Sequence, residues 1–242
     1  AGIVWIGPPS PVITTMGDKI SARQLAEKVG VPVVPGTTEP IKDLLTAKEN
    51  AEKIGFPILI KAAGGGGGKG MRIIKDPSDM KNAMEHTKSE AAKSFADDRI
   101  YIEKYLEEPH HIEIQVFADN HGNVVSLGER ECSIQRRYQK IIEETPSPYI
   151  GSKLRDELSK SAIQITRACN YSGAGTVEFM VDKHQNYYFL EMNTRLQVEH
   201  PITEMVTGID LVKEQIQVAA GEKLSFTQND IHPVGHAMEC RV

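Results

Sequence analysis

Two acidic residues that face each other across a hairpin carry the clearest chemistry in this chain. Residues 183–186 separate two short runs of alternating apolar and polar residues, which predicts a β-hairpin centred between His184 and Gln185. Counting outwards from that centre places Glu178 directly opposite Glu191, with Cβ atoms about 5 Å apart. Two carboxylates at that distance repel by about 3 to 4 kcal/mol at an effective dielectric constant near 20. A divalent cation such as magnesium, or a shared proton, would remove the repulsion, unless both side chains point to solvent.

The alternation continues beyond Glu191 as a polar ladder. Counted as a strand, the segment places one set of polar side chains on the face of Glu191: Asn193, Arg195, Gln197 and Glu199. The guanidinium of Arg195 can bind a planar anion through two hydrogen bonds, and Glu199 can act as a general base. An amphipathic edge strand would give the same period, but it would favour threonine and lysine over this set.

A glycine-rich loop at 63–70 is the second chemical signal, with five consecutive glycines followed by Lys69. One interpretation is a flexible linker. The other is a hairpin whose backbone N–H groups approach phosphate oxygens while Lys61 and Lys69 supply positive charge. The loop is not a Walker A motif, because Ala63 stands at its first glycine position and Gly70 at its Ser/Thr position. It is not a Rossmann motif either, because a strand and not a helix follows it.

The elements that must position these residues are read from periodicity and from breaking residues. We expect helices at 21–29, 46–54 with a capping box beginning at Thr46, 77–93, 152–170 with Ser152 as its cap, and 209–220. We expect strands at 58–62, 71–75, 100–106, 112–118, 124–131, 176–182 and 187–193. The first residues, 1–7, are expected to belong to a strand already under way, and 236–242 to another, as in a piece of a longer chain. This mixture of helices and antiparallel strands predicts an α+β fold.

The composition limits the class of protein. The chain has 242 residues, of which 40% are hydrophobic and 25% charged, and its formal net charge is −5. With no overall basic field and no run of about 18 apolar residues, we expect no nucleic acid and no membrane as partners. The three cysteines, Cys132, Cys169 and Cys240, form no close pair and are expected to be reduced, mostly buried thiols. We therefore expect a soluble protein of the cytoplasm or the mitochondrial matrix.

Several segments together resemble one family, the biotin carboxylase subunits or domains of biotin-dependent carboxylases, which have an ATP-grasp fold. The match covers essentially the whole chain and rests on residues 16–19, 61–71, 102–106, 111–115, 132–140, 191–201 and 235–241. The run Glu-Met-Asn-Thr-Arg-Leu-Gln-Val-Glu-His-Pro at 191–201 is nearly diagnostic. One departure is Tyr138, which stands where many relatives carry histidine. The resemblance implies the end of an N-terminal domain and a linker helix at 1–32, a glycine-rich lid domain at 33–105, and an incomplete C-terminal ATP-grasp domain at 106–242.

The resemblance also implies roles for single residues. ATP would be bound by Lys19, Lys61, Gly66, Gly67, Gly68, Lys69, Gly70, Glu103, Lys104, Leu106, His111 and Gln135. Mg²⁺ or Mn²⁺ would be bound by Glu178, Glu191 and Asn193. Bicarbonate would be held by Lys140, Arg195, Gln197 and the Val198 backbone. Glu199 would remove the bicarbonate proton, and Arg241 would stabilise the biotin enolate.

The implied reaction is the ATP-dependent carboxylation of biotin through carboxyphosphate, the first half-reaction of a biotin-dependent carboxylase. The implied partners are a biotin carboxyl carrier protein or domain, a carboxyltransferase component and, at full length, a second copy of the chain. Two alternatives remain open. One is another carboxyphosphate-forming ligase of the carbamoyl-phosphate type, with ammonia as acceptor. The other is a non-catalytic ATP-binding module, against which the intact Glu199, Arg195 and Lys140 argue.

Overall fold

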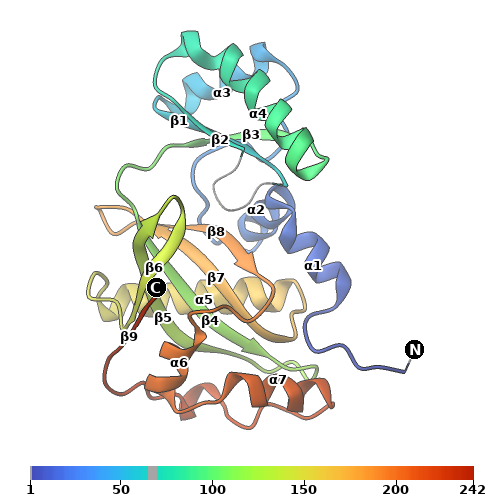
Figure 1. Cartoon of the computed structure of the whole chain (residues 1–242), viewed down its shortest axis with the longest axis vertical. Coiled ribbons are helices and arrows are strands. Elements are labelled where there is room, and N and C mark those ends of the chain that lie inside the picture. The colour runs from blue at the N-terminus through green and yellow to red at the C-terminus, as the bar shows by residue number, and fades with distance from the viewer. Residues whose placement is uncertain (1, 65–69) are drawn as a thin grey trace.

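The computed structural model describes residues 2–64 and 70–242, which form two lobes of unequal size (Figure 1). The small lobe contains a three-stranded sheet, and the large lobe contains a six-stranded sheet whose strands all pair antiparallel. Helices pack on both sheets, so the predicted α+β class is confirmed. Among the described residues, no helix combines the length and the apolar character that crossing a bilayer requires.

The N-terminal region contributes two helices to the large lobe, α1 (Ser10–Gly17) and α2 (Lys19–Lys28). α2 begins where the Asp18 side chain accepts a hydrogen bond from the backbone N–H of Ser21 at 2.8 Å. The expected strand at 1–7 is wrong for the described residues 2–7, which lie in no strand. Their apolar side chains are exposed, with Trp5 at 67%, and an apolar run forms a strand only where a neighbouring strand accepts its hydrogen bonds.

The small lobe places two helices, α3 (Leu44–Ile54) and α4 (Met80–Phe95), on a sheet of strand order β2-β1-β3. Its strands are β1 (Ile58–Ala62), β2 (Met71–Ile74) and β3 (Ile100–Lys104), and a short 3-10 turn, η1 (Pro77–Asp79), precedes α4. Buried isoleucines of the sheet pack against alanines and methionines of the helices. The expected capping box at Thr46 is wrong, because Asp43 caps α3 by accepting from the Thr46 N–H at 2.9 Å. The helix therefore begins two residues earlier than expected.

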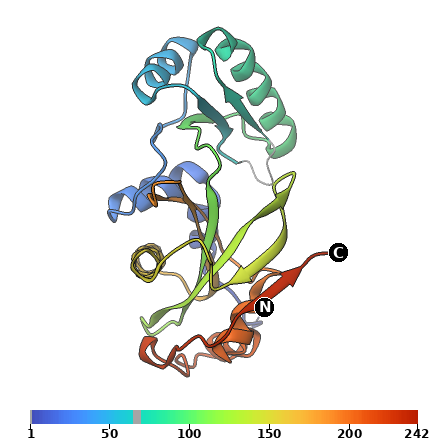
Figure 2. The ribbon, with the colours of Figure 1, turned by 90° about the vertical axis from the view of Figure 1, so that its left-hand side faces the viewer.

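The sheet of the large lobe has the order β8-β7-β4-β5-β6-β9. Its strands are β4 (His110–Ala118), β5 (Val124–Arg136), β6 (Gln139–Thr145), β7 (Gly173–Val181), β8 (Tyr187–Asn193) and β9 (Ala237–Cys240). Helix α5 (Ser152–Ala168) covers one face together with α1 and α2, as Figure 2 shows with α5 seen end-on. Helices α6 (His200–Thr207) and α7 (Leu211–Ala219), with the 3-10 turn η2 (Gln228–Asp230), lie on the other face.

Apolar and polar side chains alternate along β4, so they lie on opposite faces of the large sheet. Ile112, Ile114 and Val116 belong to the apolar core under α5. The residues between them, Glu113 and Gln115, are equally buried but point to the opposite face, because successive strand residues alternate. That face is apolar where α7 covers it and polar towards the small lobe, so the same sheet supplies both a core and a polar site.

Several elements differ from the sequence-based expectations. The sequence patterns predict neither strand β6 nor helices α1 and α6. Ser152 is not a cap, since it is the first residue of α5 and no side chain caps that helix. The expected strand continuation through 199 is wrong because β8 ends at Asn193. The expected strand at the C-terminal end is confirmed as β9.

Gly36 lies in the segment between α2 and α3, and this segment approaches strand β3 of the small lobe closely at that residue. Replacing Gly36 tests this packing. A Cβ at this position would lie 2.4 Å from the carbonyl oxygen of Ile102. We therefore expect Gly36→Ala to lower the free energy of unfolding by about 1–3 kcal/mol, because backbone has to move to relieve the overlap.

Gly17 provides the matched control, since a Cβ there would meet nothing within 4 Å. Gly17→Ala at the end of α1 should leave stability unchanged or raise it by up to about 1 kcal/mol. Urea unfolding of both variants measures the difference. Equal stabilities for the two variants would contradict the packing described at Gly36.

Candidate active site

A cavity of about 710 Å³ lies between the two lobes and collects nearly all of the predicted site residues. The predicted residues that line it are Lys19, Lys61, Glu103, Lys104, Leu106, His111, Gln135, Lys140, Glu178, Glu191, Asn193, Arg195, Gln197, Val198, Glu199 and Arg241. Gly70 is not among its lining residues, and its carbonyl accepts a hydrogen bond from the Ala62 N–H at 2.9 Å. The predicted contacts of Gly66, Gly67, Gly68 and Lys69 lie outside the described residues.

The predicted pairing of Glu178 with Glu191 is confirmed, but through a feature that the sequence did not reveal. Next to the turn, Phe179 pairs with Phe189, which is one residue out of the expected register. A bulge on β8 inserts Leu190 and restores the register, so that Glu178 pairs with Glu191. Both carboxylates line the cavity.

The two carboxylates are satisfied by different cations. Lys19 on α2 forms an ion pair and hydrogen bond with Glu191. Glu178 lies 3.0 Å from Nε2 of His111 and 2.9 Å from Nζ of Lys140. Burial opposes ionisation of Glu178, but the charges of His111 and Lys140 outweigh it and hold its pKa well below the usual range.

Oxygen donors that would suit a hard divalent cation are present at this point. Glu178 and Glu191 are cross-strand neighbours, and the Asn193 amide donates to Glu178 at 2.8 Å. Two carboxylates and an amide oxygen match the ligands that magnesium prefers. The residues therefore fit the predicted metal.

Lys140 lies at the centre of the site and touches three carboxylates. Its ammonium contacts Glu113, Glu178 and Glu199, the last at 2.6 Å. Burial would lower the pKa of Lys140, but the three negative charges raise it above its usual value. For Glu199, burial would raise the pKa, yet the charge and hydrogen bond of Lys140 lower it. Both groups are therefore charged at neutral pH.

Arg241 closes the other side of Glu199. Its Nη2 donates to Glu199 Oε2 at 2.8 Å, and its Nε lies 2.7 Å from Oε1 of Glu143. Glu143 is fully buried, and burial raises its pKa, with Glu199 adding to the rise and Arg241 opposing it. Arg241 thus lies between two carboxylates, next to the predicted general base.

The polar ladder is only partly right. Gln197 and Glu199 are buried, whereas Val198 between them is 61% exposed. Beyond Asn193 the chain leaves the sheet, so Arg195 is not held by a strand, and its Nη1 donates to the carbonyl of Leu196 at 3.2 Å. A loop and not a strand therefore presents these side chains, and buried and exposed positions alternate only over residues 197–199, since Arg195 is exposed.

A buried ion cluster joins the small lobe to α2. The carboxylate of Glu103 on β3 lies 2.6 Å from Nη1 of Arg23 and 2.7 Å from Nζ of Lys61. Lys104, the next residue, turns away and donates to the carbonyls of Gly55 and Phe56 at 2.9 and 3.0 Å. The side chain of Glu103 therefore orients Lys61 at the cavity wall.

Sequence reasoning missed four residues that shape the site: Arg23, Glu113, Arg130 and Glu143. The sequence did contain a signal for Glu113, because this residue is charged and lies within a largely apolar strand. A buried charge requires a partner, so such a residue indicates a buried polar contact. The adjacent His110 and His111 point to opposite faces of β4, since His110 stacks on Tyr149 and His111 faces Glu178.

The cysteines are all free thiols, as expected, but they are not all buried. Cys132 is buried, and burial raises its pKa well above the usual value, which suits a structural role. Cys169 is half-buried. Cys240 is exposed, which corrects the expectation for that residue, because β9 lies at the edge of the sheet.

A family model described as "Carbamoyl-phosphate synthase L chain, ATP binding domain" matches residues 18–227. The chain belongs to this family. Within it, the chain is similar to biotin carboxylases and has the predicted ATP-grasp fold.

Two relatives illustrate the similarity at the level of sequence. A pyruvate carboxylase subunit of Methanothermobacter thermautotrophicus is 55% identical over 241 residues, which is 100% of this chain and 49% of that protein. Biotin carboxylase 2 of Bacillus subtilis is 51% identical, over 99% of this chain and 54% of that protein. The chain therefore spans about half the length of these relatives.

A solved structure gives the same result for the fold. The biotin carboxylase domain dimer of Hydrogenobacter thermophilus 2-oxoglutarate carboxylase, in complex with MgADP, ADP and bicarbonate, matches with a TM-score of 0.96 at 47% identity. The match covers 99% of this chain and 53% of that one. At this identity the ATP-grasp framework of the family extends over essentially the whole chain.

The Glu103 cluster gives a pH-dependent prediction. Burial opposes ionisation of Glu103, but Lys61 and Arg23 lower its pKa below the ordinary 4.5. A group whose pKa falls on folding stabilises the fold above its unfolded pKa, and this stability is lost as the pH falls through the folded value. Glu103→Gln should therefore cost about 3–5 kcal/mol at neutral pH, since it leaves two buried cations unpaired. The cost should shrink below about pH 4.5.

Urea unfolding between about pH 3.5 and about pH 7.5 measures this difference. Glu52→Gln, on the exposed face of α3, is the matched control and should change stability by less than about 0.5 kcal/mol at any pH. A cost for Glu103→Gln that stays the same across this range would contradict the lowered pKa.

Proposed function

We propose that this chain is the ATP- and bicarbonate-binding part of a biotin carboxylase, which carboxylates the biotin of a carrier protein. The observation that carries the proposal is the arrangement around Glu199, whose carboxylate is held between Lys140 and Arg241 in the cavity that Glu178 and Glu191 also line. A base held between two cations suits the removal of a proton from a bound anion. Similarity to biotin carboxylases over the whole chain supports the same reaction.

In this proposal ATP occupies the cavity between the lobes, with Lys19 and Lys61 near its phosphates. Glu178, Glu191 and Asn193 would hold Mg²⁺, which would supply charge neutralisation at the transferring phosphoryl group. The lobe at 33–105 would act as a lid that excludes water from the reacting groups. Glu103, Lys104 and Leu106 would hold the adenine, with His111 and Gln135 near the ribose.

Bicarbonate would bind to Lys140, Arg195, Gln197 and the Val198 backbone. Its proton passes to Glu199, which is ionised at neutral pH because Lys140 lowers its pKa. An oxygen of the deprotonated bicarbonate then attacks the γ-phosphorus of ATP, and ADP leaves, so that carboxyphosphate forms. Positive charge from Lys140 stabilises the bicarbonate as it loses its proton.

Carboxyphosphate then decomposes to carbon dioxide and phosphate. The phosphate takes the N1′ proton of biotin, and the resulting enolate, stabilised by Arg241, attacks carbon dioxide. The product is carboxybiotin. A carrier protein or domain would present the biotin, and a carboxyltransferase would pass the carboxyl group on to an acceptor. We further propose that the full-length protein acts as a homodimer in the cytoplasm or in an organelle such as the mitochondrial matrix.

ADP release from Mg-ATP, with and without bicarbonate and free biotin, tests the proposal on the complete protein, including any sequence beyond residues 1–242. Release that requires both bicarbonate and biotin is the expected result. Release that depends on bicarbonate but not on biotin would favour a ligase of the carbamoyl-phosphate type with ammonia as acceptor. No release from a folded protein that binds ATP would favour a non-catalytic module, and either of these results would overturn the proposal.

Glu199→Gln tests the assigned base. The amide cannot accept the bicarbonate proton, so bicarbonate-dependent ADP release should fall by about 10²–10⁴-fold while the dissociation constant for ATP stays within about twofold. Steady-state kinetics and calorimetric titration with ATP measure the two effects.

Glu157→Gln on the outer face of α5, with 43% of its side chain exposed, is the matched control and should leave both quantities unchanged. Loss of ATP binding in a folded Glu199→Gln variant would show that the residue supports the nucleotide site and would contradict its role as the base.

A further inference from the structure

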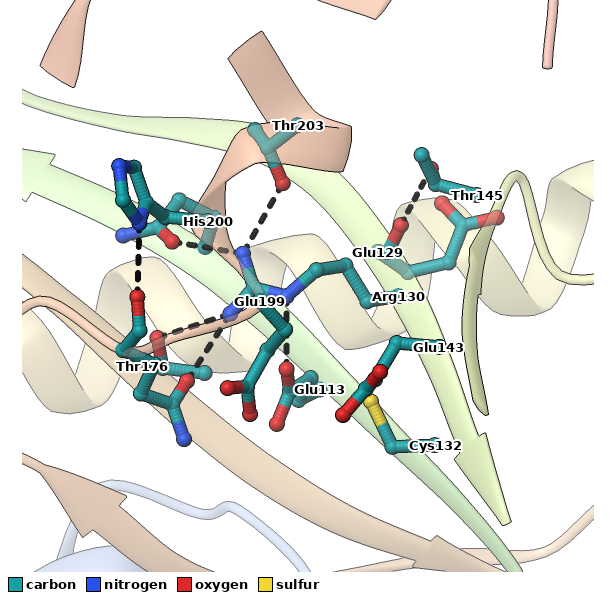
Figure 3. Close-up of polar contacts among 12 residues, drawn as sticks. Glu113, Glu129, Arg130, Cys132, Glu143, Thr145, Thr176, Glu199, His200 and Thr203 are labelled. Carbon is teal, nitrogen blue, oxygen red and sulfur yellow. Dashed lines mark hydrogen bonds and ion pairs between the residues drawn. The ribbon is translucent and has the colours of Figure 1, made fainter. Parts of the chain in front are cut away.

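Arg130 lies in the middle of β5, directly behind the anion-binding part of the cavity, and its side chain is fully buried. Figure 3 shows its guanidinium at the centre of a group of polar side chains from several elements. It lines no part of the cavity. A fully buried arginine is rare unless its charge and its donors are satisfied, so its contacts indicate what it does.

All five N–H donors of the guanidinium are used. Nε donates to Glu113 at 2.6 Å, and Nη1 donates to Gln115 at 2.7 Å and to Thr203 at 2.9 Å. Nη2 donates to Gln197 at 2.9 Å and to Thr176 at 3.2 Å. These acceptors come from β4, from α6, from β7 and from the loop after β8. One planar group therefore connects four separate segments of the chain.

Two of these contacts lead directly to groups in the cavity. Glu113 accepts a hydrogen bond from Arg130 with one oxygen and from Lys140 with the other. The guanidinium therefore positions the carboxylate that Lys140 contacts. Gln197 accepts from Arg130 through Oε1, which leaves its Nε2 to donate to Glu178 at 3.1 Å. The orientation of the Gln197 amide is therefore set by Arg130.

The charge of Arg130 matters as much as its shape. Lys140 touches three carboxylates, from Glu113, Glu178 and Glu199. Alone it could not compensate three negative charges, and an incoming anion would be repelled. Because Arg130 neutralises Glu113 from behind, more of the positive charge of Lys140 remains available to an anion in the cavity.

We propose that Arg130 is a positioning residue of the bicarbonate subsite, which orients Lys140 through Glu113 and orients Gln197 directly. This inference rests on the proposed function, because it concerns the binding of bicarbonate at that site. Arg130 contacts no substrate. Its effect should therefore appear in the binding of bicarbonate and not in the binding of ATP.

Arg130→Lys tests the proposal, because lysine keeps the positive charge but cannot reproduce a planar fork with five donors. Measured as ADP release by the complete protein, the KM for bicarbonate should rise by about tenfold or more, the factor expected when one charge-assisted hydrogen bond is lost. The dissociation constant for ATP should stay within about twofold. A purely structural arginine would lower the melting temperature and leave the KM for bicarbonate unchanged, which would overturn the proposal.

Thr203→Val provides a second variant if Arg130→Lys does not fold. It removes one acceptor of Arg130, lies outside the cavity lining and keeps the shape of the side chain. The KM for bicarbonate should rise by about two- to fivefold, less than for Arg130→Lys, because only one of the five hydrogen bonds of the guanidinium, the one to the neutral hydroxyl of Thr203, is lost. An unchanged KM in the folded Thr203→Val protein would overturn the proposal.

Arg155→Lys is the matched control. Arg155 also pairs with a buried carboxylate of β5, since its Nε donates to Glu129 at 2.7 Å, but Glu129 and Arg130 point to opposite faces of the strand. Its KM for bicarbonate should equal that of the wild type, and an equal rise in both arginine variants would overturn the proposal. Failure of the proposed function itself would be distinguished by a wild-type protein whose ADP release does not depend on bicarbonate.

Discussion

The contacts of the half-buried ammonium of Lys140 with three carboxylates are the interactions on which the rest of the site depends. The ammonium neutralises carboxylates from β4, from β7 and from the start of α6, which are far apart in the sequence. Without it these three acids could not lie together in a buried site, since like charges at short range in a medium of low dielectric constant repel strongly. The same positive charge that allows the acids to gather also lowers the pKa of Glu199. Stability and proposed chemistry therefore rest on one group.

The architecture explains how so many charges can be buried at all. Strands β4 and β7 place apolar residues under α5 and polar residues on the opposite face, as Ile112 and Glu113 do. The polar face is closed from behind by α6 through the contact of Thr203 with Arg130, and from above by the small lobe through Arg23 and Glu103. Each of these charged side chains therefore contacts a partner of opposite sign.

Most patterns of short range were read correctly from the sequence, but the caps expected at Thr46 and Ser152 were wrong. The hairpin of β7 and β8, the strands that flank the glycine loop and the α+β class all follow from local alternation and breaking residues. Other errors arose where a local pattern needs a distant partner. Residues 2–7 are apolar but have no strand beside them, whereas β6 is rich in charge and still forms a strand, because β5 and β9 pair with it on either side.

The sequence by itself determined which residue types are available for chemistry and in what order they follow one another along the chain. Only the tertiary structure decided which cation meets which carboxylate. Lys19 and Glu191 are 172 residues apart, and no local period relates them. The bulge at Leu190, the loop that replaces the expected strand after Asn193 and the five contacts of Arg130 likewise depend on neighbours that only the folded chain brings together. Long-range electrostatic pairing has no signature along the chain, because it depends on distance in space.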